Sequence, residues 1–178
     1  MAGRGKSTAT DMVRSLAVVG IAVAFLVFYS LQEKPQFSVP NVDVDATVQA
    51  ARKNLDFPVL ALGTVPPKWR SNGAFLDPIR GEGERWNFHV GYVTPDNHYF
   101  GIDESNQVDI GAFVSGFLYG VDTGEKRTVA GLEFKRYTNE KQQIWLHRGI
   151  TSTPYAIVIT GVGSAEEFEV FAKQLSAG

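Results

Sequence analysis

The sequence contains no cysteine, and this absence excludes several kinds of protein. Without thiols the chain cannot hold a disulfide framework, a thiolate zinc site, a thiol nucleophile or a lipid attached through cysteine. An excess of positive charge is also lacking, because 17 Lys and Arg stand against 19 Asp and Glu. Nucleic-acid binding depends on clustered basic residues, so we expect no nucleic-acid partner.

What the chain does contain is enough apolar material for one core. Its 178 residues suit a single domain of ordinary size, and 44% of them are hydrophobic. Aromatic residues make up 12% of the chain, which argues against disorder along its whole length. The sequence therefore predicts a globular domain that needs no covalent crosslink.

The longest apolar run covers residues 15–31, seventeen positions without a charge. This length equals the lower limit of about 17 residues for a membrane-spanning helix, so the run is just long enough to span. Arg4, Lys6 and Arg14 precede the run against a single acid, Asp11. The positive-inside bias then predicts a cytoplasmic stub at residues 1–14, a bilayer contact through residues 15–31, and an extracytoplasmic remainder at the cell membrane.

A cleaved signal peptide and a buried core helix both fit the run less well. A signal peptide needs small residues after the apolar stretch, but the only Ala-x-Ala triplet, Ala22 to Ala24, lies in its middle. A buried core helix is disfavoured because the run has no polar face. We therefore expect an uncleaved single-pass anchor.

After the anchor, residues 32–42 contain Pro35 and Pro40 and are expected to form an extended tether. Residues 43–178 are expected to form the domain, with Asp45, Asp109 and Ser164 as helix N-caps. The order of the expected elements predicts an α+β fold with a mostly antiparallel sheet. This order is helix, three strands, helix, three strands, helix. The expected elements are a helix over 45–55, strands at 69–75, 86–93 and 99–102, a helix over 110–118, strands at 128–137, 143–151 and 155–160, and a helix over 164–175.

The two βββα halves resemble each other. Residues 86–91 align with residues 144–149, and the alignment matches His89 with His147 and a glycine with a glycine. A duplication would explain the match. Similar strand patterning that arose independently would explain it equally well, so both possibilities stay open.

His89 and His147 are the most attractive candidates for chemistry, because both lie in the middle of predicted strands. A metal site would need a third ligand, and the nearby acids follow no ligand pattern. Ser115 lacks the G-x-S-x-G context of a nucleophile, and residues 120–128 break the spacing of a phosphate loop and are expected to be a turn. We expect no metal and no cofactor, and hydrogen-bonded strand histidines are the simpler interpretation.

Aromatic residues interleaved with arginine are typical of binding patches, although aromatics at strand spacing also form cores. The aromatic and basic candidates for binding, beside the two histidines, are Trp69, Arg70, Trp86 and Tyr92.

Several short segments resemble one family. The segments are P-P-K-W-R at 66–70, G-Y-V-T-P at 91–95, an alanine-rich first helix and a terminal G-S-A…F…L helix. They resemble the actinobacterial membrane-anchored proteins grouped as DUF4245, from which Phe134 departs where a tryptophan is expected. The resemblance implies a cell-envelope location and brings no activity, substrate or catalytic residue. The order of strands and helices is also similar to the fold of PsbP and Mog1-like proteins, which bind partners.

The favoured hypothesis is therefore a non-enzymatic, uncharacterised envelope protein whose external α+β domain binds an envelope protein or a small ligand. The alternative is an envelope hydrolase or metal-dependent enzyme that uses His89 and His147. A third hypothesis is a structural tether that interacts with its own copies.

Protease added to intact protoplasts should remove the domain at residues 43–178, because the charge bias places it outside the membrane. Immunoblotting with an antibody against the C-terminus measures this loss. Protection of the domain in intact protoplasts, with digestion only after lysis, would overturn the predicted orientation.

Overall fold

The computed structural model of the protein describes residues 5–32, 43–139 and 141–178. It divides into two compact units, Met1–Ser38 and Val39–Gly178, which are described separately. Residues 1–4 of the expected stub and residues 33–42 of the expected tether lie outside the described residues.

Helix α1 (Gly5–Gln32) makes up the described part of the first unit and contains all of residues 15–31. The large apolar side chains between Met12 and Val27 are 52–75% exposed, so this stretch is apolar at its surface. In the described part of the chain, no helix combines the length and the hydropathy that crossing a membrane requires.

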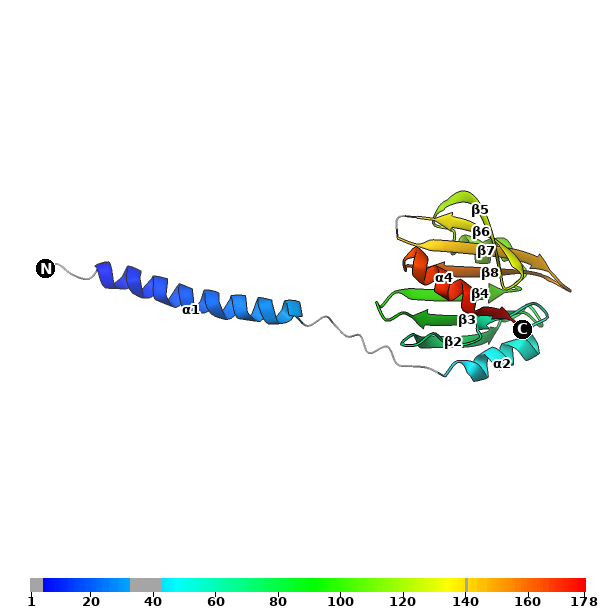
Figure 1. Ribbon diagram of the computed structural model, residues 1–178, viewed down its shortest axis with the longest axis horizontal. Coiled ribbons are helices and arrows are strands. Elements are labelled where there is room, and N and C mark those ends of the chain that lie inside the picture. The colour runs from blue at the N-terminus through cyan, green and yellow to red at the C-terminus, as the bar shows by residue number, and fades with distance from the viewer. Residues whose placement is uncertain (1–4, 33–42, 140) are drawn as a thin grey trace. The chain divides into compact units, whose positions relative to one another are not determined.

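The second unit is built on a seven-stranded sheet in which every neighbouring pair is antiparallel (Figure 1). The predicted α+β class with an antiparallel sheet is therefore confirmed. In spatial order the strands are β2 (Arg70–Pro78), β3 (Trp86–Val93), β4 (Tyr99–Ser105), β8 (Pro154–Gly161), β7 (Gln143–Ile150), β6 (Leu132–Thr138) and β5 (Val121–Val129).

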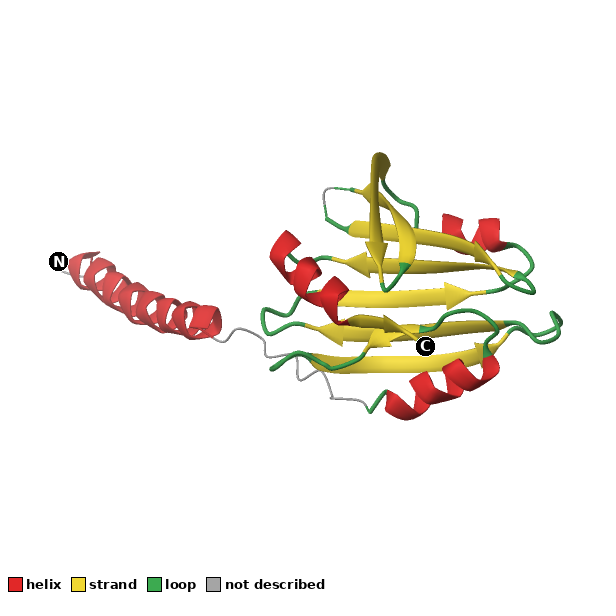
Figure 2. Ribbon diagram, turned by 45° about the vertical axis from the view of Figure 1, so that its right-hand side comes forward, coloured by secondary structure: helices red, strands yellow, loops and turns green. Residues whose placement is uncertain are grey.

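Helices cover both faces of this sheet, but unequally (Figure 2). Helices α2 (Asp45–Asn54) and α4 (Ala165–Gln174) lie on one face, together with a small sheet of β1 (Leu60–Leu62) and β9 (Leu175–Ala177). We call this the main face, because the larger hydrophobic core fills it. The short helix α3 (Ile110–Ser115) lies on the other face, which we call the α3 face, over a smaller cluster.

The helix caps are mostly as expected. Asp109 accepts a hydrogen bond from the backbone N–H of Ala112, and Ser164 forms a complete capping box with Glu167. The prediction for Asp45 is wrong, because α2 begins at this residue and its N-cap is Val44. The side chain of Asp43 instead accepts from the N–H of Asp45 at 3.0 Å. The acid that hydrogen-bonds the start of the helix therefore lies two residues before the expected one.

The second half of the sheet differs from the prediction at its edge. One strand was expected at 128–137 and a turn at 120–128, but the chain forms the hairpin β5–β6. Ala130 and Gly131 both have positive φ angles, 49° and 83°, as the two central residues of a tight hairpin turn do. Strand β5 is an exposed edge strand without an apolar face, so its polar residues resembled a loop. The three-residue strands β1 and β9 were not predicted either.

Among the described residues, the core contains one carboxyl group, that of Glu104 on β4. Its side chain is fully buried, and Oε1 accepts a hydrogen bond from the backbone N–H of Leu60 at 2.7 Å. No group in the described chain hydrogen-bonds Oε2. Burial raises the pKa of Glu104 well above its ordinary value, although the Leu60 hydrogen bond acts in the opposite direction. The protonated carboxyl group of Glu104 thus links β1 to the seven-stranded sheet through a hydrogen bond.

This burial predicts a stability that falls as pH rises. The carboxyl ionises near its ordinary pKa of about 4.3 when unfolded but keeps its proton to higher pH when folded. Its contribution is therefore complete below that value and is lost as pH rises through the folded pKa, at up to about 1.4 kcal/mol per pH unit. Urea unfolding at several pH values should show this slope in the wild type and not in Glu104→Gln.

Glu84→Gln provides the matched control, because Glu84 lies in an exposed loop. We expect it to keep the slope of the wild type. An equal slope in Glu104→Gln and in the wild type would contradict a protonated core acid.

Candidate functional site

On the α3 face, the two halves of the sheet differ in what covers them. Ile110 and Val114 of α3 pack over strands β7 and β8. Strands β2, β3 and β4 contribute no α3-face side chain to either core cluster. This half instead carries Phe75, His89, Tyr99 and Asp103, which we call the open-face cluster.

The register of the sheet assembles the cluster. Phe75 of β2 pairs with His89 of β3, and His89 pairs with Asp103 of β4, so these three side chains form a row across three strands. Side chains alternate between the faces of a strand. His89 therefore points away from its neighbours Phe88 and Val90, which are buried in the main core.

A chain of hydrogen bonds links three members of the cluster. His89 Nδ1 lies 2.7 Å from Asp103 Oδ1, and Tyr99 Oη lies 3.1 Å from His89 Nε2. Burial, and then the charge of Asp103, raise the pKa of Tyr99 to about 12, so the phenol is neutral at physiological pH. The phenol can then donate to Nε2 in the tautomer of His89 whose Nδ1–H faces the carboxylate.

Glycines make room for this arrangement. Gly91 and Gly101 face each other across β3 and β4. A Cβ atom at either position would lie within 2.9 Å of the ring or the hydroxyl of Tyr99. The tyrosine therefore lies across both strands where side chains would otherwise stand. The next glycine in the row, Gly73 on β2, has open space above it.

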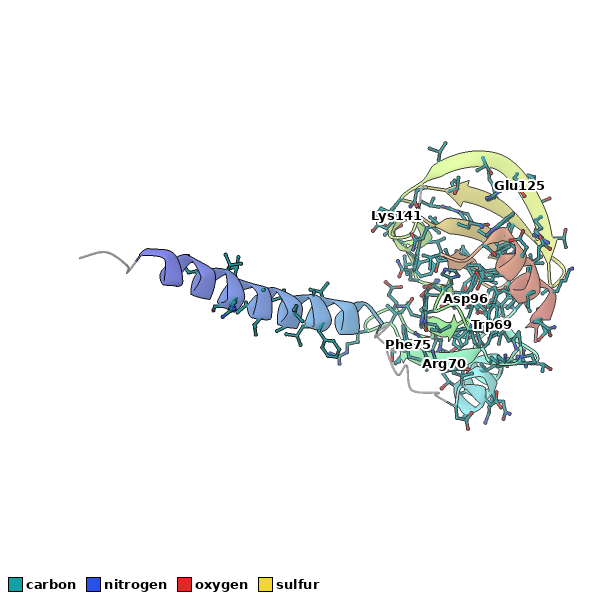
Figure 3. The ribbon with its side chains drawn as sticks, turned by 60° about the vertical axis from the view of Figure 1, so that its left-hand side comes forward. Trp69, Arg70, Phe75, Asp96, Glu125 and Lys141 are labelled. Carbon is teal, nitrogen blue, oxygen red and sulfur yellow. The ribbon has the colours of Figure 1, made fainter. Side chains whose placement is uncertain are left out.

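Phe75 is the most exposed member of the cluster. Its ring is stacked on His89, with centroids 4.9 Å apart and planes 20° from parallel, and 46% of the residue is exposed. Figure 3 shows Phe75 and Trp69 on different sides of the sheet, with Trp69 on the side of α4. An exposed phenylalanine fixed by a stacked, hydrogen-bonded histidine is a rigid apolar contact point.

The structure distributes the predicted site residues over both faces. Arg70 shares the α3 face and its guanidinium donates to Asn97 Oδ1 at 3.4 Å. Trp69 stacks on Phe100 and Phe171 in the main core and lines a shallow cavity of about 620 Å³ beside α2.

Trp86 and Tyr92 belong to the main face as well. Trp86 begins β3 and its backbone N–H donates to Asn106 Oδ1. Tyr92 is 1% exposed, and its hydroxyl accepts from the backbone N–H of Leu62 at 3.3 Å. We conclude that Trp69 and Tyr92 act mainly as core residues.

His147 does not share a site with His89. It contacts Phe134 and Tyr155 of the main core, and its Nε2 lies 3.2 Å from the Tyr155 hydroxyl. The two histidines thus lie on opposite faces, and a site that uses both is excluded. Among the described residues, no three His, Asp or Glu side chains are placed to hold a metal ion.

Sequence reasoning missed Phe75, Tyr99 and Asp103 as members of one site. A usable signal was present in the turn at residues 94–97. This turn pairs Val93 with Tyr99, and the same register carried four residues further pairs His89 with Asp103. Phe75 gave no such signal, because the bulge between Ser71 and Gly73 shifts the register of β2.

A model of the family described as "Protein of unknown function (DUF4245)" matches residues 4–175. The chain belongs to the DUF4245 family. The resemblance predicted from the segments at 66–70 and 91–95 is therefore confirmed. The similarity to PsbP and Mog1-like proteins stays a prediction.

Comparisons with individual proteins add little to the DUF4245 assignment. No curated protein sequence matches the chain significantly. Among solved structures, the chain is similar to LpqN of Mycobacterium tuberculosis, which is described as involved in cell envelope biogenesis. The TM-score is 0.33 at 13% identity, over 78% of this chain and 98% of that chain. These values are too low to transfer a function.

Tyr99→Phe should lower the free energy of unfolding by about 0.5–1.5 kcal/mol, because it removes one partly buried hydrogen bond to His89. Urea denaturation measures the change. Tyr119→Phe is the control, since Tyr119 is 71% exposed, and should leave stability unchanged. Equal stabilities of the two variants would contradict the hydrogen-bonded chain.

Proposed function

We propose that this DUF4245 protein is a single-pass envelope protein whose extracytoplasmic domain binds another envelope component through the open-face cluster. The proposal has two parts, an anchor and a binding surface, and they rest on different residues.

The anchor is supported by the sequence. Residues 15–31 carry no charge, basic residues outnumber acidic ones before them, and α1 contains the whole run. A short tether at residues 32–42 would then keep the domain within reach of the membrane surface. The proposed boundaries are 1–14 for the stub, 15–31 for the span and 43–178 for the domain.

The single observation that carries the binding surface is Phe75. What distinguishes Phe75 is not exposure alone but a ring held by stacking on His89 within a polar surround, which is typical of aromatic anchors in recognition sites. Its neighbours His89, Tyr99 and Asp103 are satisfied by one another, so the surface is organised before a partner arrives. Preorganisation of this kind reduces the entropy lost on binding.

An enzyme is the less supported candidate. The hypothesis of a hydrolase or metal enzyme required His89 and His147 to act together, and they face opposite sides of the sheet. The His89 Nε2 that would act as a base is already bonded to Tyr99.

Photo-crosslinking in living cells tests the proposed surface. With p-benzoyl-phenylalanine in place of Phe75, irradiation should produce one dominant adduct with an envelope component. The control places the same residue at Val121, which is 74% exposed on the opposite edge strand, and should not produce that adduct. Identical adducts from both positions, or none from position 75, would overturn the proposed surface.

A further inference from the structure

The geometry points to a neutral carbohydrate as the ligand of the open-face cluster. We infer that a pyranose ring stacks on Phe75 and that its hydroxyl groups hydrogen-bond the polar side chains of the neighbouring strands. This inference rests on the proposed function and specifies the chemistry of the component bound at the same site.

The first argument is the combination of an apolar plane with hydrogen-bonding groups. A pyranose has carbon-bound hydrogens on its two faces and hydroxyl groups around its rim. An aromatic face carries partial negative charge and attracts such hydrogens. Phe75 is half-exposed and offers the ring face that His89 does not cover, and Asp77 two residues along β2 is an exposed acceptor on the same face of the sheet.

The second argument is the shape of the surface beside Phe75. Gly73 precedes Phe75 on this face of β2, and apart from its chain neighbours Asn72 and Ala74 no residue has an atom within 4 Å of the place where its Cβ would stand. A ligand can therefore approach the backbone closely at this point. Across β3, the Asn72 side chain and the Tyr99 ring both lie over Gly91, the partner of Gly73, so the open space is bordered by a polar amide as well as an aromatic ring.

The third argument is the spread of the polar groups. Neighbouring strands are about 4.8 Å apart, so the row from Phe75 on β2 to Asp103 on β4 spans about 10 Å. This width corresponds to roughly two linked sugar rings. The Asp103 side chain remains 19% exposed while it holds His89, which leaves part of the carboxylate accessible.

Charge selects among polar ligands. Asp77 and Asp103 both lie on this face, and they would repel a phosphorylated or sulfated glycan. Arg70, a cation on the same face, is engaged with Asn97, and Arg85, which precedes β3, donates to the backbone carbonyl of Asn106. A basic peptide would also meet acids and aromatic rings here. It is less suited, because a single cationic group is held best in an enclosed cage, whereas these groups lie along a shallow open row.

Isothermal titration calorimetry of the fragment 43–178 provides the test. The fragment lies within the compact unit Val39–Gly178 and contains both hydrophobic core clusters. The probes are neutral hexasaccharides of glucose, mannose, galactose and arabinose, with octalysine as the basic peptide. At least one hexasaccharide should bind, and Phe75→Ala should weaken that binding by about tenfold, as expected for one aromatic contact.

Gly73→Val should abolish the same binding, because the new side chain fills the open space without a clash at its Cβ. Val121→Ala, on the opposite edge strand, should change the affinity less than twofold. Circular dichroism verifies that each variant is folded. If Gly73→Val fails to fold, the hexasaccharide affinities of Gly73→Ala and Phe75→Ala provide the test instead.

Two results would overturn the inference. One is the absence of binding to every hexasaccharide, and the other is binding that Phe75→Ala and the Gly73 variants leave unchanged. Octalysine binding that requires Phe75 would assign a basic protein partner instead. In that case photo-crosslinking from position 75 should still yield an adduct. The proposed function would then stand, but the assignment of a carbohydrate ligand would be wrong.

Discussion

The register of the β3–β4 hairpin is the constraint on which the candidate site and the core both depend. The turn at residues 94–97 pairs Val93 with Tyr99, and this pairing fixes every later pair along the two strands. His89 therefore meets Asp103 on one face, while Phe88 meets Glu104 on the other. A slip of one residue would exchange the two acids and move both to the wrong face of the sheet.

The same pairing sets the chemistry of the two neighbouring carboxyl groups. Asp103 is partly exposed and meets an imidazole nitrogen, whereas Glu104 is fully buried and meets a backbone N–H. Adjacent residues of one strand thus experience opposite environments. Burial favours the protonated form of Glu104, and burial together with the charge of Asp103 raises the pKa of Tyr99 and keeps its phenol neutral.

Sequence patterns predicted the parts of the fold that have a strong local cause. The capping box at Ser164 and the alternation of Phe88, Val90 and Tyr92 each identified an element correctly. Strand β5 was missed because an edge strand needs no apolar face. Only part of the candidate site was predicted from the sequence. His89 was identified as a candidate residue, but the residues around it depend on which strands pair and in which register. Pairing across a bulge, as for Phe75, cannot be obtained from periodicity alone.

Strand β5 also limits how copies of the domain can meet. Four of its charged side chains are engaged with groups of the same domain: Asp122 with Lys135, Glu125 with Arg136, Lys126 with Glu133, and Arg127 with Glu169. A row of charged side chains on an edge strand disfavours edge-to-edge pairing with a second sheet. The charges on β5 thereby protect this side of the sheet against growth by addition of further strands.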